Sequence, residues 1–340
     1  EEKPIETTLE LVEVIKSAFS KKEKRKEYRL LAFVAKGKGI FKFLIVIGSL
    51  LTVLVIFLVS YVIFDSNIYD ELYSKIEVTA HRGNSTVTMP NTIPAFKEAI
   101  KEGADYGELD VRQTKDNVIV VTHDASLKEM TGQDINVRDL TYEELQKIPC
   151  IEVNGNKCTV PKLEDVINVC KGKIKLNIEI KTGNNDSEDF VSDVVKIIEN
   201  TDFVDKCVVT SLDYRALRKV KECNPKIKTG YIMAVAMGDF YDLPCVDFFR
   251  METTFVNGRV VERAHKLNKE IHVWTVNDDD SLKKCVELEV DNIITDNVAG
   301  AKSAIATHGD DVFSIVLNQL KESDNSKENI KKTNRILEDV

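Results

Sequence analysis

The sequence predicts a (β/α)8 barrel of the TIM type preceded by one transmembrane helix. An uncharged apolar run occupies residues 43–64. After it, from residue 76 to residue 306, short apolar segments alternate with segments whose apolar residues recur at helical spacing. There are eight such alternations, the number that a barrel needs, whereas a doubly wound sheet usually stops at about five or six strands.

The short apolar segments have the composition of buried parallel strands, being rich in Val and Ile. We expect these strands at residues 76–80, 106–111, 174–180, 206–210, 227–232, 246–251, 271–276 and 292–295. Amphipathic patterns fall between most of them and after the last. They predict helices at residues 94–102, 163–170, 187–200, 213–223, 256–267, 279–288 and 297–306.

One further segment, residues 117–123 (NVIVVTH), has the pattern of a strand but does not fit this count. It follows Asp110 too closely for a helix to intervene. Residues 115–117 (KDN) are typical of a tight turn. We therefore expect a hairpin that folds back over the top of the second strand.

The apolar run at residues 43–64 contains 22 residues, with no charge and no proline. As a helix it would be about 33 Å long, enough to cross the hydrocarbon core of a bilayer. A cleaved signal peptide is the alternative, but the run is too long for one and no small-residue cleavage pattern follows it. The run therefore predicts a transmembrane helix in contact with a lipid bilayer.

Charge on either side of this run predicts its orientation. Residues 21–42 hold nine Lys and Arg residues, whereas residues 65–80 hold one. Basic residues favour the cytoplasmic side, so the protein is expected in the cell membrane with its catalytic domain outside the cytoplasm. The expected segments are a cytoplasmic basic and amphipathic segment at 1–42, the transmembrane helix at 43–64, the barrel at 65–309 and a polar C-terminal helix or tail at 310–340.

The basic run could instead be a solvated linker or a nucleic-acid-binding patch. Its position directly against the apolar run favours the topological interpretation. The whole chain carries a net charge of −9, which argues against recognition of a nucleic-acid backbone. We therefore expect no nucleic-acid partner.

The seven cysteines form no CxxC pair and no cluster with histidine, so they do not predict a zinc site. Cys150 and Cys158 flank the turn sequence Asn154-Gly155. A loop centred on Asn154 would make the two cysteines cross-strand neighbours, close enough for a disulfide outside the cytoplasm. A two-residue turn would instead pair Cys150 with Thr159, and two free thiols remain the alternative.

Reactive side chains gather where the expected strands end, which is the catalytic face of a barrel of this kind. Alternation along the second expected strand places Glu108 and Asp110 on the same face of that strand. In the same way, Glu179 and Lys181 share one face at the end of the third expected strand. The remaining polar strand ends are His81-Arg82, His123-Asp124 and Trp274. Each of these strand ends alone is weak evidence for a functional site. A Glu-x-Asp pair, for example, is commonly found on a solvated strand face.

Taken together, these strand ends predict cleavage of a phosphoester. Carboxylates that point into a barrel are costly unless they are paired or bind metal, and ligation by oxygen alone suits Ca²⁺ or Mg²⁺. Glu108, Asp110 and Glu179 are therefore the expected metal ligands. His81 and His123 could act as general acid and general base. The positive charges of Arg82 and Lys181 suit a phosphate group.

The same residues carry a resemblance to the glycerophosphodiester phosphodiesterase family. That family has the pattern H-R-G, P-E-N-T, A-F, E-L-D-V, T-x-D-G and V-V-x-H-D. This chain has HRG at 81–83, NT at 91–92, AF at 95–96, ELDV at 108–111, TKDN at 114–117 and VVTHD at 120–124. Similar stretches follow, namely PKLEDV at 161–166, IEIK at 178–181, TSL at 210–212, WTVN at 274–277 and IITD at 293–296.

The resemblance covers residues 76–306. It implies that His81 and His123 are the acid/base pair, that Glu108, Asp110 and Glu179 hold the metal, that Arg82 and Lys181 contact phosphate, and that Trp274 lines the substrate side. The implied reaction is metal-dependent hydrolysis of a small or lipid-derived glycerophosphodiester to sn-glycerol 3-phosphate and an alcohol. A departure from the motif lies beside the expected site, because Pro90 stands where the family has glutamate.

Two other functions remain open at this point. A phospholipase-type or polyglycerolphosphate-cleaving enzyme could use the same barrel, and a membrane anchor would keep its site near such substrates. A barrel that binds phosphodiesters without cleaving them belongs to a different class, and the change at Pro90 is what suggests it. Metal-stimulated turnover of a panel of diesters would separate these possibilities.

Overall fold

A computed structural model of the protein describes residues 50–54, 76–233 and 240–307. The chain divides into two compact units, residues 1–70 and residues 71–340. Of the first unit, residues 50–54 are described, and they are helical. No helix within the described ranges is long and apolar enough to cross a membrane. The predicted transmembrane segment 43–64 lies outside those ranges except for residues 50–54, and the predicted segments 1–42 and 310–340 lie wholly outside them.

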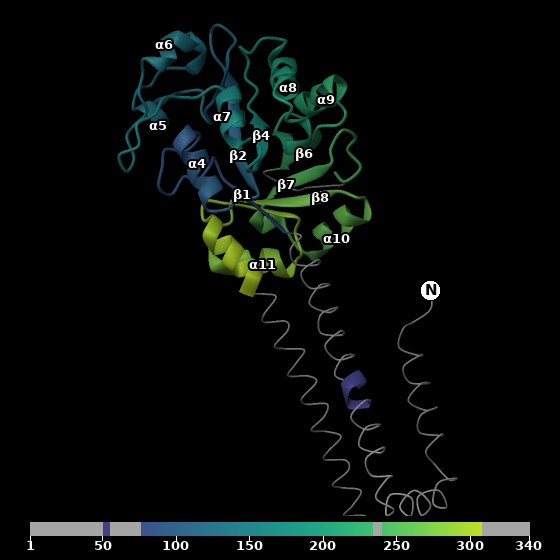
Figure 1. The fold of residues 1–340 in the computed structure, drawn as a ribbon. Coiled ribbons are helices and arrows are strands. Elements are labelled where there is room, and N and C mark those ends of the chain that lie inside the picture. The colour runs from purple at the N-terminus through teal and green to yellow at the C-terminus, as the bar shows by residue number, and fades with distance from the viewer. Residues whose placement is uncertain (1–49, 55–75, 234–239, 308–340) are drawn as a thin grey trace, which may run out of the picture. The chain divides into compact units, whose positions relative to one another are not determined.

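The second unit contains a closed barrel (Figure 1), as predicted. Within the described residues, eight strands pair in parallel in the order β1-β9-β8-β7-β6-β5-β4-β2, and β1 pairs with β2 to close the ring. The strands are β1 Glu77–Ala80, β2 Tyr106–Gln113, β4 Lys175–Ile180, β5 Cys207–Ser211, β6 Lys228–Met233, β7 Phe248–Glu252, β8 Glu270–Trp274 and β9 Asn292–Thr295. All eight predicted strands are confirmed to within about two residues at each end, the usual uncertainty of such boundaries.

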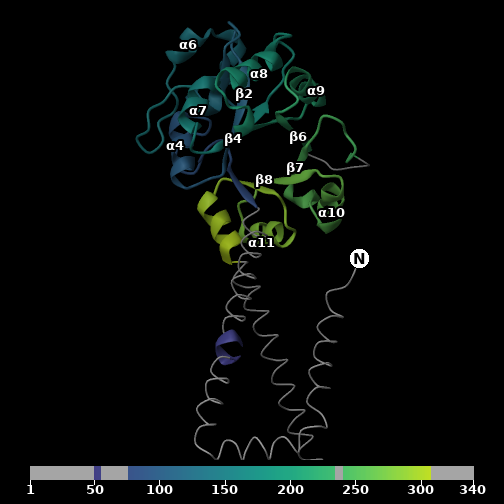
Figure 2. The same ribbon diagram turned by 45° about the vertical axis from the view of Figure 1, so that its right-hand side comes forward.

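Helices cover the outside of this ring, and Figure 2 shows the same arrangement from a second direction. They are α4 Ile93–Lys101, α7 Leu163–Cys170, α8 Phe190–Asn200, α9 Tyr214–Cys223, α10 Gly258–Lys266 and α11 Asp279–Glu287, followed by a helical segment at 298–307. Their apolar faces pack on the outward side chains of the strands and form the main core. The inward side chains of the strands are left for the interior and the mouth of the barrel.

The predicted hairpin is confirmed, because β3 (Ile119–Val121) pairs antiparallel with the end of β2. The segment after it was not predicted. It contains α5 Lys128–Thr131, a 3₁₀ turn η1 Val137–Asp139 and α6 Tyr142–Gln146. Its buried residues, among them Leu127 and Met130, form a second core together with Met89 and Val120. In Figure 1 this segment lies to one side of the barrel, above α4.

All seven cysteines lie in the described ranges and carry free thiols. Cys150 and Cys158 are cross-strand neighbours, because the backbone N–H of Cys150 donates to the carbonyl of Cys158 at 2.9 Å. The loop geometry that a bridge would need is therefore present. The two sulfurs are nevertheless separate thiols, which was the alternative to the disulfide.

Candidate active site

The three predicted metal ligands converge at the barrel mouth. Glu108 and Asp110 lie on the inner face of β2, and Glu179 lies on the inner face of the neighbouring strand β4, where Asp110 and Glu179 are register partners. Each of the three residues is at most 3% exposed. One oxygen from each carboxylate lies within 4.8 Å of the others. Three acidic groups held this close and out of water need compensating positive charge.

Arg250, on β7, provides part of that charge, and the sequence analysis did not identify it. Its Nη1 donates to Glu108 Oε1 at 2.9 Å and to Glu179 Oε2 at 2.8 Å. Arg250 is 2% exposed, and although burial alone would lower its pKa, Glu108 and Glu179 raise the pKa above the usual value. Burial raises the pKa of the Glu179 carboxyl, an effect that Arg250 opposes and Asp110 reinforces.

Lys181, just past the end of β4, is the second cation. Its Nζ contacts a carboxylate oxygen of Glu179 and lies 3.2 Å from Asp110 Oδ1. Asp110 also accepts a hydrogen bond from Asn91 Nδ2 at 2.9 Å. Burial would raise the pKa of Asp110, but Lys181 and its other neighbours hold that pKa below its usual range. The three carboxylates thus face Arg250 and Lys181, and Arg82 Nε lies 3.7 Å from Asp110 Oδ2 as a third positive charge.

The turn after β1 is shaped around Glu108. The backbone N–H of Arg82 donates to Glu108 Oε2 at 2.8 Å, and that of Gly83 donates to the Glu108 carbonyl at 3.1 Å. Gly83 has φ +76°, and a Cβ there would lie 2.7 Å from that of Ala95. This position therefore requires glycine, because any other residue would strain the backbone and its Cβ would clash with Ala95. The turn points His81 and Arg82 toward the mouth.

His81 has a partner from the opposite end of the sequence. Its Nδ1 lies 2.9 Å from Asp296 Oδ1, just past the end of β9. Asn277 Nδ2 and Ser85 Oγ donate to the same carboxylate at 2.7 and 2.9 Å. Burial would raise the pKa of Asp296, but the hydrogen bond and charge of His81 hold that pKa far below its usual range. Asp296 therefore accepts from Nδ1, which leaves His81 Nε2 available for a further hydrogen bond.

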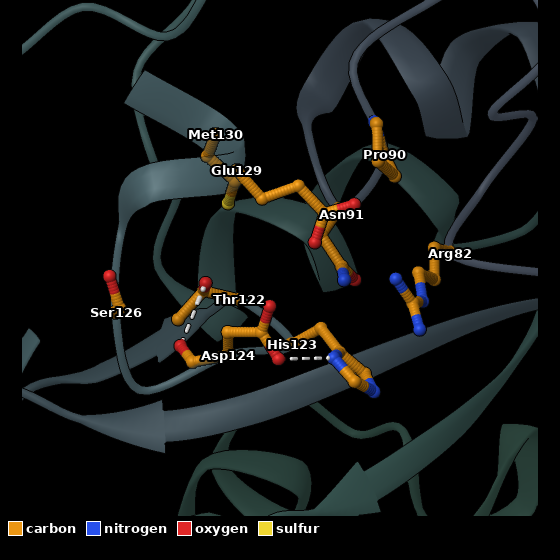
Figure 3. A pocket seen from close by; sticks show the side chains of 9 residues that line it. All are labelled: Arg82, Pro90, Asn91, Thr122, His123, Asp124, Ser126, Glu129 and Met130. Carbon is orange, nitrogen blue, oxygen red and sulfur yellow. Dashed lines mark hydrogen bonds and ion pairs between the residues drawn. The ribbon is translucent and has the colours of Figure 1, made fainter. Parts of the chain in front are cut away.

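His123 follows β3 on the far side of the hairpin and is held differently. Its Nδ1 lies 2.8 Å from Oδ1 of the adjacent Asp124, and its carbonyl accepts from Arg112 Nε at 2.7 Å. Partial burial would raise the pKa of Asp124, but the hydrogen bond from His123 lowers it overall. Figure 3 shows His123 and Arg82 on the same small pocket, and both residues line it.

Known proteins share both the barrel and these motifs. A family model described as the glycerophosphoryl diester phosphodiesterase family matches residues 81–299. The chain belongs to the glycerophosphoryl diester phosphodiesterase family. A glycerophosphodiester phosphodiesterase of Caldanaerobacter subterraneus is 31% identical over 230 residues, 66% of this chain and 95% of the relative. One of Bacillus altitudinis is 30% identical over 231 residues, 65% of this chain and 94% of the relative.

A solved structure supports the fold of this family for the chain. It is an Oleispira antarctica phosphodiesterase in complex with the product sn-glycerol-3-phosphate. The two chains superpose with a TM-score of 0.64 at 23% identity, over 69% of this chain and 99% of that one. Membership of the glycerophosphoryl diester phosphodiesterase family makes the chain a phosphoric diester hydrolase, as the sequence predicts.

The remaining predicted residue, Trp274, lies at the end of β8. Its ring faces the Arg250 guanidinium, with 5.2 Å between the ring centroid and Cζ. Its side chain is half-buried. The structure thus brings Trp274 next to the carboxylate cluster through Arg250.

Two site residues went unidentified because their partners are remote in sequence. Arg250 lies in the apolar strand sequence FFRME, where a lone charge on an inward position was the available signal. Asp296 belongs to the family stretch IITD, but nothing local shows that its carboxylate meets His81. Both contacts exist because the ring closes β9 onto β1 and places β7 across from β2.

Proposed function

We propose that this chain hydrolyses glycerophosphodiesters to sn-glycerol 3-phosphate and an alcohol, using a divalent cation, Ca²⁺ or Mg²⁺, and a pair of histidines. The observation that carries this proposal is the buried cluster of Glu108, Asp110 and Glu179 at the mouth of the barrel. The Oleispira relative, with its bound sn-glycerol-3-phosphate, supports the choice of product.

The cluster fits such a cation. Its donors are all carboxylate oxygens, which hard divalent cations prefer. Asp110 Oδ1 is buried and accepts no hydrogen bond among the described residues, although Lys181 Nζ lies 3.2 Å away, so its hydrogen-bonding capacity is not used. When bound there, the cation supplies positive charge to a non-bridging phosphate oxygen.

The residues of the chain do the rest of the chemistry. Arg82 and Lys181 hold the phosphate, and Trp274 lines the substrate side. One histidine accepts a proton from the nucleophile, which is water or a neighbouring hydroxyl of the substrate, and the other gives a proton to the departing alcohol. Asp296 and Asp124 fix the Nδ1 atoms of His81 and His123, so that Nε2 of each ring faces the reaction.

The activity is tested by turnover of the purified full chain on a panel of diesters. We expect glycerophosphocholine and glycerophosphoethanolamine to be cleaved, with release of sn-glycerol 3-phosphate. EDTA should lower the rate by at least about 10²-fold, because a bound cation contributes several kcal/mol of charge stabilisation. Added Ca²⁺ or Mg²⁺ should restore it. Full activity in EDTA would refute the requirement for a divalent cation. A failure to cleave any of the diesters would refute the proposed activity.

Lysophospholipid is a second candidate substrate. A mouse relative named lysophospholipase D is 26% identical over 258 residues, 64% of this chain and 82% of that protein. An apolar anchor at residues 43–64 would hold the barrel beside lipid substrates. The same panel should therefore include lysophosphatidylcholine and polyglycerolphosphate, and faster turnover of either would reassign the natural substrate.

The anchor and its orientation form part of the proposal. We place residues 43–64 in the cell membrane and the barrel outside the cytoplasm, because basic residues precede the apolar run. Cys223, an exposed thiol on α9, reports on this directly. We expect a membrane-impermeant maleimide to label it in intact cells, with the Cys223→Ser variant as control. If Cys223 were labelled only after cell lysis, the barrel would lie on the cytoplasmic side instead.

A further inference from the structure

A small pocket beside the carboxylate cluster contains one acidic residue that the mechanism above does not use. The pocket is lined by Arg82, Pro90, Asn91, Thr122, His123, Asp124, Ser126, Glu129 and Met130. Glu129 comes from α5, in the segment that the sequence did not predict. In Figure 3 its side chain extends from α5 across the pocket toward the side where Asn91 and Arg82 lie.

The opposite wall of this pocket lacks the carboxylate that the family motif would place there. Pro90 occupies that position and offers no polar side chain. Arg82 is affected, because its Nε is buried and donates no hydrogen bond to any described residue. Its nearest acidic atom is Asp110 Oδ2, 3.7 Å from Nε, which is an ion pair without a hydrogen bond. The guanidinium therefore lacks a hydrogen-bonding carboxylate of its own.

The backbone around Glu129 is firmly held, although Glu129 itself is exposed. The neighbouring Leu127 and Met130 are buried in the second core. The backbone N–H of Leu127 donates to the Ile135 carbonyl at 2.9 Å, and Gly132 ends the helix with φ +75°. Glu129 also meets the side chain of Asp124, and this hydrogen bond helps to lower the pKa of the Asp124 carboxyl. The Glu129 side chain therefore extends into the pocket from a backbone that is fixed in place.

We propose that Glu129 supplies, from the far wall of the pocket, the carboxylate that Pro90 does not provide, and that it positions Arg82 for the substrate phosphate. This inference rests on the proposed function. Glu129 is a positioning residue, because it acts through Arg82 and does not itself touch the reacting atoms. The segment after β3 thereby becomes part of the site.

The sign of the effect distinguishes this role from simple surface charge. A solvated carboxylate near an anion site repels the anion, so its removal would tighten phosphate binding. A carboxylate that orients the phosphate-binding guanidinium has the opposite effect, because its removal leaves Arg82 free to adopt other rotamers. Binding of sn-glycerol 3-phosphate, measured by calorimetry on the full chain, reports this sign without any turnover.

We expect Glu129→Gln to raise the dissociation constant for sn-glycerol 3-phosphate about tenfold and to lower kcat/KM for glycerophosphocholine by a similar factor. Adding Pro90→Glu to this variant should restore both values to within about threefold of wild type, because it returns a carboxylate to the opposite wall. In an Arg82→Gln background, Glu129→Gln should change either value less than about twofold, since coupled residues are not additive.

Glu143→Gln is the matched control, because Glu143 is an exposed glutamate of α6 in the same segment. It should match wild type in binding, turnover and melting temperature. Unchanged or tighter binding in Glu129→Gln would overturn the proposal, and so would an undiminished loss in the Arg82→Gln background. If the chain cleaves no diester, the proposed function fails while the binding measurements still decide the role of Glu129.

Discussion

Asp110→Asn is expected to abolish turnover and the binding of divalent cation together. The substitution keeps the size of the side chain but removes one of the three carboxylate charges that would hold the cation. We expect kcat/KM to fall by at least about 10³-fold, because the lost stabilisation is several kcal/mol. Metal content of the purified protein, measured by elemental analysis, should fall in parallel. Glu108→Gln and Glu179→Gln should behave in the same way.

Glu262→Gln provides the control for this series. Glu262 pairs with Lys266 one turn along the exposed face of α10, and that contact lies on the helix that covers β8. Exposed pairs of this kind contribute little to stability, so activity and metal content should both be unchanged. An Asp110→Asn protein with full metal content and full turnover would remove these carboxylates from the chemistry.

His81→Ala should lower kcat by about 10²- to 10⁴-fold, the range that general acid–base catalysis supplies. The loss should be accompanied by the disappearance of one limb of the pH–rate profile, because one proton transfer then depends on solvent. His123→Ala should remove the other limb. Binding of sn-glycerol 3-phosphate should change much less than kcat, since phosphate is held mainly by other groups.

His265→Ala is the matched histidine control. His265 lies on the surface of α10, where its Nε2 meets Asp291 at 2.8 Å. Its activity and pH profile should match wild type. A single histidine variant that keeps both limbs of the profile at full rate would exclude that histidine from proton transfer.

The barrel itself was predictable because its signals are local. Each strand is a short apolar run, and each covering helix has its own amphipathic face, so both follow from periodicity within about ten residues. Glu108 and Asp110 could also be placed, because alternation along β2 fixes their common face. The hairpin was recognised for the same reason, from the turn at residues 115–117.

The rest depends on contacts between distant segments. Arg250 could not be assigned from the sequence, because its two partners lie 142 and 71 residues away. The segment holding α5 and α6 has helices of four and five residues, too short for a periodic pattern to appear. Its shape instead follows from the second core, in which Leu127 and Met130 pack with Met89 from a different loop.

Arg250 also bears on how the protein would respond if the proposed cation were withdrawn. Nη1 bridges Glu108 and Glu179, so two of the three acidic groups keep a fixed, buried counter-charge. Buried charges that retain a partner avoid the large penalty of isolated ones. Chelation should therefore leave an intact barrel that regains activity on simple addition of the ion, without refolding. Where ion supply fluctuates, such a protein can be switched off and on repeatedly while the same molecules persist.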